Sequence, residues 1–319
     1  METRKLYYED PFQKGFATTV VSCDAVKGGY AVVLAETAFY PEGGGQPYDT
    51  GVLGEANVLE VHEKNGVITH LCDKPFEVGK SVSGKIDWAR RFDHMQQHSG
   101  EHICSGLICE RFHCDNVGFH MGADVVTIDF NADISWDELM EIEQLANLYI
   151  YEDHPIDIQF YRGAELDKVE YRSKKPLEGA VRIVSFPGAD CCACCGTHVV
   201  RSGQVGLVKF LSVQKFRDGV RIELLSGKRA HRYLSECWAQ DVRIAQALSV
   251  KPNASFAGVE RVLAELSALK QRCAKLEESV FAQTAAQYEG KDDVLLFEDE
   301  MSGDSLRKLC DAVTNHCGG

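Results

Sequence analysis

Two pairs of metal-binding side chains stand at the same four-residue spacing in distant parts of the chain. His94 and His98 form the first pair, and Cys194 and His198 form the second. Residues four apart lie on one face of an α-helix, so the imidazoles of the first pair can face one ion. Three imidazoles and a thiolate suit the tetrahedral coordination of Zn²⁺. The sequence therefore predicts one zinc site, although a histidine pair at this spacing also occurs on ordinary exposed helix faces.

The cysteine-rich segment 190–196 (DCCACCG) leaves the choice of sulfur ligand open. Spacing favours Cys194, which stands four residues before His198. A separate Cys-x-x-Cys site of Cys191 and Cys194 would need two further ligands. Whether Cys191, Cys192 or Cys195 also bind metal stays open. Asp93 or Glu101 is expected to hold an imidazole in one tautomer, and His102 to reach the rim of the site without binding the ion.

A glycine-dense segment, residues 39–51 (FYPEGGGQPYDTG), is more specific in its order than a simple hairpin turn. Its three consecutive glycines, Gly43, Gly44 and Gly45, allow the backbone to approach a ligand or another domain closely. We therefore expect this loop to contact the substrate of any site that the zinc ligands form.

Composition limits the classes of function. The chain has 319 residues, 45% of them hydrophobic, which is enough for a sizeable core. A net charge of -14 argues against general coating of nucleic acid, so any phosphate contact must come from local basic clusters. Three such clusters stand out, each of which is also explained as an ordinary solvated face: Arg172, Lys174 and Lys175; Lys209, Lys215, Arg217 and Arg221; Lys228, Arg229 and Arg232.

Neither a signal peptide nor a long apolar segment is recognisable, which predicts no membrane insertion. The 13 cysteines then indicate a reducing compartment in which thiols stay free or bind metal. A cytoplasmic protein is expected.

Hydrophobic patterning predicts an α+β protein in four segments. Residues 1–89 alternate short strands with turns, as in a small antiparallel β-barrel. Residues 90–248 combine helices and strands, including a helix that begins with a capping box of Ser135 and Glu138. Residues 249–287 carry an apolar heptad stripe, typical of a coiled coil or of packing against the helix at 228–248. Residues 288–319 read as one strand and one helix, the start of a further small domain that the chain does not complete.

The ligand pairs, the segment FYPEGGGQPYDTG and the run CCGTHV together resemble the editing domain of alanyl-tRNA synthetases. They are most similar to the free-standing AlaX family of alanyl-tRNA editing proteins. The resemblance implies a small β-barrel, then a zinc-binding editing domain of the threonyl/alanyl type, then a long heptad helix. One departure is Cys195, which stands where the family has the first glycine of a Gly-Gly pair.

The resemblance also implies an activity, a cofactor and partners. The expected reaction is Zn²⁺-dependent hydrolysis of tRNA(Ala) mischarged with Ser, and secondarily with Gly. The heptad stripe, apart from the resemblance, predicts either packing against the helix at 228–248 or a homodimer, formed through the heptad helix or through the further carboxyl-terminal domain. Thr37 would sense the serine hydroxyl, His120 would orient water and Gln46 would line the mouth of the site. Thr197 joins the three glycines among the substrate contacts. Thr37 and His120 can equally be structural, as a strand residue and a buried histidine.

Two other classes of function compete with editing. One is a noncatalytic RNA-binding module in which zinc only joins the helix at 94 to the loop at 194. The other is a metallopeptidase, which is the poorer fit because Met95, Gln96 and Gln97 stand where a His-Glu-x-x-His motif would place its base.

Overall fold

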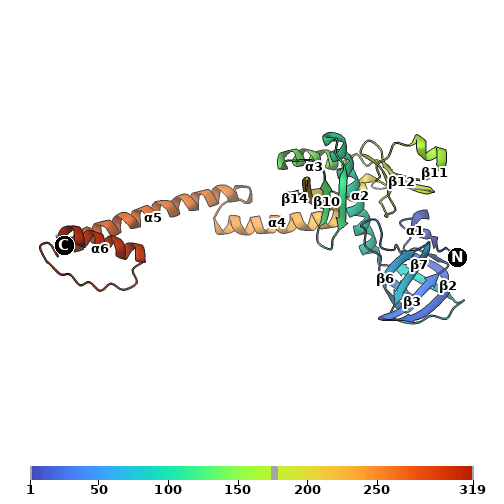
Figure 1. Cartoon of the computed structure of the whole chain (residues 1–319), viewed down its shortest axis with the longest axis horizontal. Coiled ribbons are helices and arrows are strands. Elements are labelled where there is room, and N and C mark those ends of the chain that lie inside the picture. The colour runs from blue at the N-terminus through green and yellow to red at the C-terminus, as the bar shows by residue number, and fades with distance from the viewer. Residues whose placement is uncertain (1, 174–178, 318–319) are drawn as a thin grey trace. The chain divides into compact units, whose positions relative to one another are not determined.

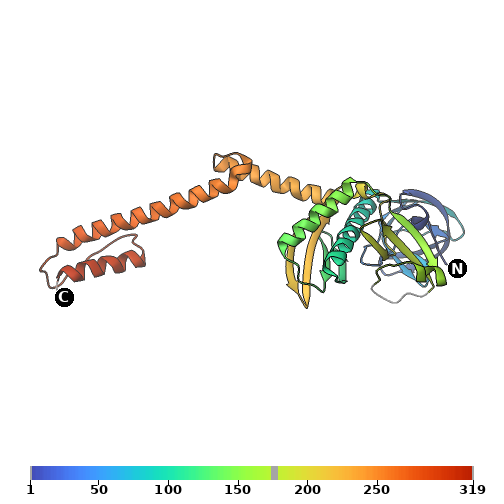
Figure 2. The same ribbon diagram turned by 90° about the horizontal axis from the view of Figure 1, so that it is seen from above.

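The computed structural model describes residues 2–173 and 179–317, so the predicted basic residues Lys174 and Lys175 lie outside the described residues. Contacts divide the chain into two compact units, Met1–Leu234 and Ser235–Gly319. The α+β class is confirmed: helices and antiparallel sheets share the first unit (Figures 1 and 2). None of the described helices is long and apolar enough to cross a bilayer.

The amino-terminal segment folds into a closed barrel with strand order β2-β3-β7-β6-β5-β8. Apolar side chains alternate with exposed ones along β2, so one face fills the barrel interior. A short parallel pair and a single-turn helix precede or flank the barrel. The bounds are β1 Arg4–Lys5, α1 Leu6–Glu9, β2 Gly15–Val26, β3 Gly29–Leu34, β4 Glu36–Thr37, β5 Gly51–Leu53, β6 Ala56–Lys64, β7 Val67–Cys72 and β8 Ser81–Ile86.

The rest of the first unit is built around α2, which follows the barrel directly. Helices α2 and α3 pack together against a four-stranded sheet of order β14-β15-β10-β9, and α2 also contacts β13 of a three-stranded sheet of order β11-β12-β13. The bounds are α2 Trp88–Phe112, β9 Asn116–Met121, β10 Val126–Phe130, α3 Trp136–Tyr151, β11 Asp157–Arg162, β12 Ala180–Phe186, β13 Asp190–Ala193, β14 Val208–Phe216 and β15 Gly219–Ser226; 3-10 turns cover Gly163–Lys168 and Ser202–Val205.

The predicted capping box at the start of α3 is confirmed. The Ser135 Oγ accepts a hydrogen bond from the Glu138 backbone N–H, and the Glu138 carboxylate accepts one from the Ser135 N–H at 2.9 Å. Two donors of the first helical turn are thereby satisfied. Helix α3 can then direct Leu139, Ile142 and Ala146 into the core that it shares with α2 and the sheet.

A buried ion pair joins α2 to the barrel. The Arg91 guanidinium binds both carboxylate oxygens of Asp49, and both side chains are fully buried. Arg91 also donates to the backbone carbonyls of Ala38 and Pro11. Because Asp49 belongs to the glycine-dense loop, this pair fixes that loop against the helix that carries the predicted metal ligands.

The second unit is helical. It contains the end of α4 (Gly227–Ala247), a 3-10 turn (Pro252–Ala254), α5 (Ser255–Ala286) and α6 (Gly303–Cys317). Phe281 and Ala285 of α5 pack on Leu309 and Val313 of α6. The strand predicted within residues 288–319, on the apolar run at 292–300, is wrong. Residues 292–300 have no strand partner among the described residues and take an irregular path between the two helices.

The heptad stripe of α5 is exposed. Leu266 and Leu276, for example, keep 46% and 57% of their accessible surface. Packing against the helix at 228–248 therefore does not cover this stripe. The four-segment division of the chain and the homodimer both stay predictions.

Candidate metal centre

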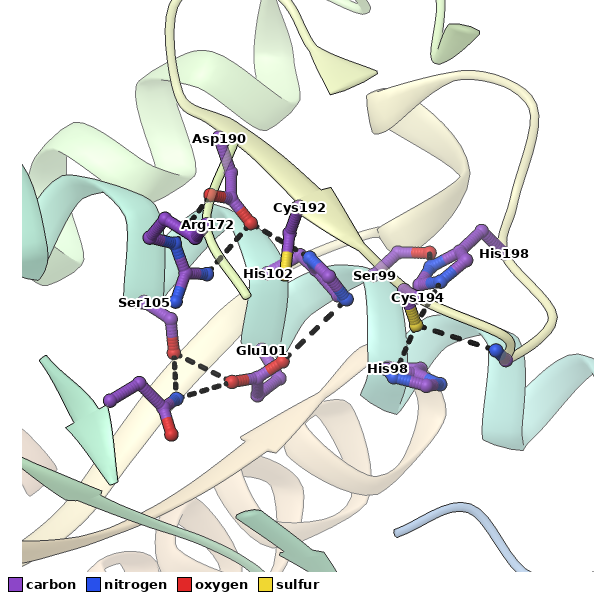
Figure 3. A network of polar contacts seen from close by, with 12 residues as sticks. His98, Ser99, Glu101, His102, Ser105, Arg172, Asp190, Cys192, Cys194 and His198 are labelled. Carbon is purple, nitrogen blue, oxygen red and sulfur yellow. Dashed lines mark hydrogen bonds and ion pairs between the residues drawn. The ribbon is translucent and has the colours of Figure 1, made fainter. Parts of the chain in front are cut away.

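Four side chains that bind metals in other proteins meet in the interior of the first unit. Their donor atoms, from His98, His102, Cys194 and His198, all lie within 4.8 Å of one another. The Cys194 Sγ lies 3.4 Å from the Nε2 atoms of both His98 and His198 (Figure 3). Three imidazoles and one thiolate at these separations form a plausible tetrahedral donor set for zinc.

The structure corrects one member of the predicted set: His102 takes the place of His94. Both have the four-residue spacing from His98, but each step of four residues turns the position by about 40° around the helix. The loop at 194–198 meets α2 beside His98 and His102. His94 instead lies one turn toward the amino terminus, where burial and the nearby cations Arg90 and Arg229 lower its pKa to about 3.

A second layer of contacts orients each imidazole. The Nδ1–H of His98 faces the Gln46 Oε1 at 2.8 Å, and that of His102 faces the Asp190 carboxylate at 2.7 Å. The Nδ1 of His198 lies 3.2 Å from the Ser99 Oγ. With each Nδ1 occupied, the Nε2 atoms are left to face the centre, which is the arrangement that fixes the tautomer of metal-bound histidines.

The glycine-dense loop is part of this second layer. The Gln46 side chain is fully buried, donates to the Thr197 Oγ1 at 2.8 Å and accepts from the Thr197 backbone N–H at 3.0 Å. Gly196 is needed at this contact, because a Cβ there would lie 2.1 Å from the His98 ring. Gln46 and Thr197 therefore position His98 and the 194–198 loop, rather than lining an opening as we expected of Gln46.

Two of the three glycines that we expected to contact the substrate, Gly43 and Gly45, shape the loop itself. Gly43 closes the loop by exchanging backbone hydrogen bonds with Gln46 at 3.0 and 3.1 Å. Gly45 has a φ of +84°, and a Cβ there would lie 2.5 Å from the Phe119 ring. Only Gly44 of the three lines the cavity described below.

Neighbouring groups stabilise the charged forms of Cys194 and Asp190. Burial alone would raise the pKa of Cys194, but the neighbouring histidines outweigh it and hold the pKa well below the usual thiol range. Burial is likewise outweighed at Asp190, whose pKa is lowered by hydrogen bonds from His102 and Arg172. Arg172 binds Asp190 with two contacts of 2.8 Å. Both groups are thus favoured in the charged form that suits a metal centre.

A cavity of about 210 Å³ opens beside the cluster and shares His98, His102 and Cys194 with it. Its other lining residues come from the glycine loop, α2, β9, β13 and the segment before β12; they include Glu101, Asn116, Phe119, Arg172 and Cys192. Cys192 also forms a second, three-membered group of donors with His102 and Asp190. Cys191 and Cys195 belong to neither donor group among the described residues.

Glu101, which lines this cavity, forms a small polar network with Ser105 (Figure 3) and with Asn116. The Glu101 Oε1 accepts hydrogen bonds from the Ser105 Oγ at 2.6 Å and from the Asn116 Nδ2 at 2.8 Å, while Oε2 lies 4.0 Å from the His102 Nε2. No spacing rule pointed to Asn116. Glu101 and Arg172 had signals in the sequence, one as a neighbour of the histidines and one in a basic cluster.

Thr37 and His120 lie outside the lining of this cavity. Thr37 is fully buried in the barrel, where its Oγ1 bonds the His70 Nε2 at 2.9 Å and accepts the Phe39 N–H at 3.1 Å. His120 is exposed on β9, on the strand face opposite Phe119. The structure therefore brings neither the expected hydroxyl sensor nor the expected water-orienting histidine to the metal cluster, and His120 is not the buried structural histidine of the alternative reading.

The Thr37–His70 contact predicts a pH-dependent stability. Burial lowers the pKa of His70 to about 4, whereas an unfolded histidine titrates near 6.5. Below pH 6.5 the unfolded chain gains a proton that the folded barrel excludes, so stability is complete above that pH and falls on acidification. About 2 kcal/mol should be lost between pH 6.5 and pH 5. Urea unfolding at both pH values measures this loss.

The matched variants are His70→Gln and His62→Gln, the second at an exposed position on β6. The loss of stability on acidification should shrink in His70→Gln and persist in His62→Gln. Equal pH dependence in all three proteins would show that His70 does not cause it.

Two family models match parts of this chain. The family described as tRNA synthetases class II (A) matches residues 12–90, and the threonyl and alanyl tRNA synthetase second additional domain matches residues 181–223. The Alanyl-tRNA editing protein Aarsd1-A of Xenopus laevis is 30% identical over 301 residues, which cover 89% of this chain and 73% of that protein. The chain belongs to the alanyl-tRNA editing protein family.

Two further relatives are similar to most of this chain. The Alanyl-tRNA editing protein AlaX-L of Pyrococcus horikoshii is 31% identical over 295 residues, covering 87% of this chain and 71% of that protein. The alanine–tRNA ligase of Pyrococcus abyssi is 35% identical over 310 residues, which cover 91% of this chain. The chain spans about a third of the length of the alanine–tRNA ligases that it matches.

Proposed function

We propose that this editing protein hydrolyses the ester bond of mischarged tRNA(Ala), with Ser-tRNA(Ala) the leading substrate and Gly-tRNA(Ala) the second. The observation that carries the proposal is the donor cluster of His98, His102, Cys194 and His198 beside an open cavity. A purely structural zinc would be expected in a closed site, so the cavity supports hydrolysis over a noncatalytic RNA-binding module. A volume of about 210 Å³ suits the aminoacyl group.

The donor set fits a Zn²⁺ cofactor. His98, His102 and His198 would supply Nε2 atoms and Cys194 a thiolate, with Gln46, Asp190 and Ser99 holding the three rings. When bound, the ion would supply positive charge that activates water or fixes the pose of the substrate's amino group. Four protein ligands fill a tetrahedral site. The ion could therefore assist if it only positions the substrate, if one ligand is loosely held, or if its coordination expands.

The chain's own residues can hold the aminoacyl ester. An ester needs no further activation, so catalysis depends chiefly on placing its carbonyl and stabilising the oxyanion that develops. The Glu101 carboxylate lines the cavity and can accept hydrogen bonds from the amino group of the substrate. Arg172, held by Asp190 at the same cavity, adds a fixed positive charge.

Asn116 is the residue that we assign to recognition of the serine hydroxyl. It is 6% exposed, and its Oδ1 is buried with no hydrogen-bond partner in the described part of the chain. The orientation of the amide is fixed, because its Nδ2 donates to the carboxylate of Glu101 and to the Ser105 Oγ. A buried acceptor without a partner is costly, and a serine hydroxyl would satisfy it where alanine has only a methyl group.

Replacing Asn116 by Ala should therefore lower the Ser-over-Ala ratio of kcat/KM about tenfold, the effect of one lost hydrogen bond to the substrate. The ratio is measured by deacylation of Ser-tRNA(Ala) and Ala-tRNA(Ala). Cys195→Ala is the matched control, since it changes another side chain that lines the cavity and leaves the contacts of Asn116 in place. An equal fall for both esters would show that Asn116 only supports Glu101.

The function itself is tested with the intact, zinc-loaded protein. Ser-tRNA(Ala) and Gly-tRNA(Ala) should be deacylated, and Ala-tRNA(Ala) should be spared. Absence of hydrolysis of every ester by folded, metal-loaded protein would refute the hydrolase and favour the RNA-binding module.

Homodimerisation through α5 belongs to the same proposal. Its apolar stripe keeps the heptad spacing and is left exposed, as expected of a face that a second copy covers. Light scattering gives the mass in solution, and a monomeric mass would exclude the dimer.

A further inference from the structure

A second cavity of about 440 Å³ lies at the amino-terminal ends of two helices in the first unit. Ala89 and Arg90, from the first turn of α2, line one side, and Lys228 and Arg229, from the first turn of α4, line another. The backbone N–H groups of Arg90 and Lys228 already donate to the Asp87 Oδ1 and the Gln96 Oε1, but the dipole of each helix still places partial positive charge at this end. Two such ends at one cavity favour an anion.

The side chains add to this positive charge. Arg90, Lys228, Arg229 and Arg232 line the cavity, against a single carboxylate, Asp93. That carboxylate is already bound by Arg229, with contacts of 2.7 and 3.0 Å. The cavity is therefore strongly cationic in a chain whose net charge is -14.

His94, which the metal cluster does not use, also lines this cavity. It is 3% exposed, and its Nδ1 has no hydrogen-bond partner within the described residues. A buried imidazole between cations stays neutral and retains one N–H group to donate. An anion in the cavity would relieve the repulsion among the cations that line it.

We propose that this cavity binds a backbone phosphate of the RNA whose 3′ ester enters the metal-side cavity. The assignment rests on the proposed function. Position supports it, because His94 and His98 lie one helical turn apart, about 6 Å along α2. Pro47 lines the second cavity, and the adjacent Gln46 bonds His98. The two cavities therefore lie beside adjacent turns of α2, close enough for one RNA strand to reach both.

The test measures affinity for an uncharged tRNA(Ala) transcript over a series of salt concentrations, a readout that needs no hydrolysis. The variant is Lys228→Gln with Arg232→Gln. The matched control is Lys27→Gln with Lys85→Gln, which removes the same charge from exposed barrel positions. Loss of two phosphate contacts should weaken binding about tenfold near 0.1 M salt and lower the slope of log K against log salt by about 1.5.

Three results would overturn the proposal. The first is affinity and salt slope unchanged in the cavity variant, and the second is an equal loss in the control, which would reflect net charge alone. The third comes from titration with inorganic phosphate. If the cavity variant no longer binds phosphate but keeps its affinity for the transcript, the cavity is a site for a free anion. The experiment measures RNA binding and not hydrolysis. A native protein that binds the transcript but hydrolyses no ester would refute the proposed hydrolysis without affecting the proposed phosphate site. Thermal unfolding of the native protein and of the two double variants confirms that each protein compared is folded.

Discussion

His102→Ala is expected to lose its bound zinc and at least 100-fold in deacylation of Ser-tRNA(Ala), whereas His94→Ala should keep one zinc per chain. His102 contributes to the buried donor cluster, and His94 does not. Loss of a residue that merely orients a ligand already lowers metal affinity or activity about 10- to 100-fold, so loss of a ligand should cost at least the upper figure. Zinc content and single-turnover deacylation, measured on the same samples, check this expectation.

The two histidine variants form a matched pair, because they change the same residue type on the same helix. Circular dichroism and urea unfolding of the zinc-free proteins separate lost metal from lost fold. Zinc retained by His102→Ala and lost by His94→Ala would return the ligand set to the one expected from spacing. His94→Ala is expected to affect affinity for RNA instead, since its side chain lines the cationic cavity.

Arg91→Met should destabilise the first unit by about 3–5 kcal/mol. The change leaves the fully buried Asp49 carboxylate without its cation and removes donors from the Ala38 and Pro11 carbonyls. Removing one partner of a buried ion pair costs this much because the remaining charge stays uncompensated. Urea unfolding followed by fluorescence measures the free energy of unfolding.

Two further variants show whether the buried charge is the cause. Arg111→Met removes an ion pair with Glu141 at the surface and should cost less than about 1 kcal/mol. Arg91→Met with Asp49→Leu removes both buried charges and should recover part of the loss. A double variant as unstable as the sum of the two single ones would argue that packing, and not the unpaired carboxylate, explains the effect.

Local sequence determined most of the secondary structure. Alternating apolar residues in the first 89 positions led to barrel strands, and Ser135 with Glu138 marked the start of α3, because these signals depend on neighbours in the chain. The same reasoning predicted a strand at 292–300, and this prediction is wrong. The apolar run there has a strand pattern, but a strand needs a partner, and none of the described residues provides one.

For the site, the sequence determined the residue types and a four-residue spacing, and this spacing is satisfied equally by His94 with His98 and by His98 with His102. Only the tertiary structure decided between them, because the 194–198 loop is held over one particular turn of α2 by Gln46 and Thr197. The same is true of Asn116 and of the cationic cavity, whose members come from separate elements. Spacing along one helix fixes which side chains share a face, whereas the contacts between distant segments fix which of them meet.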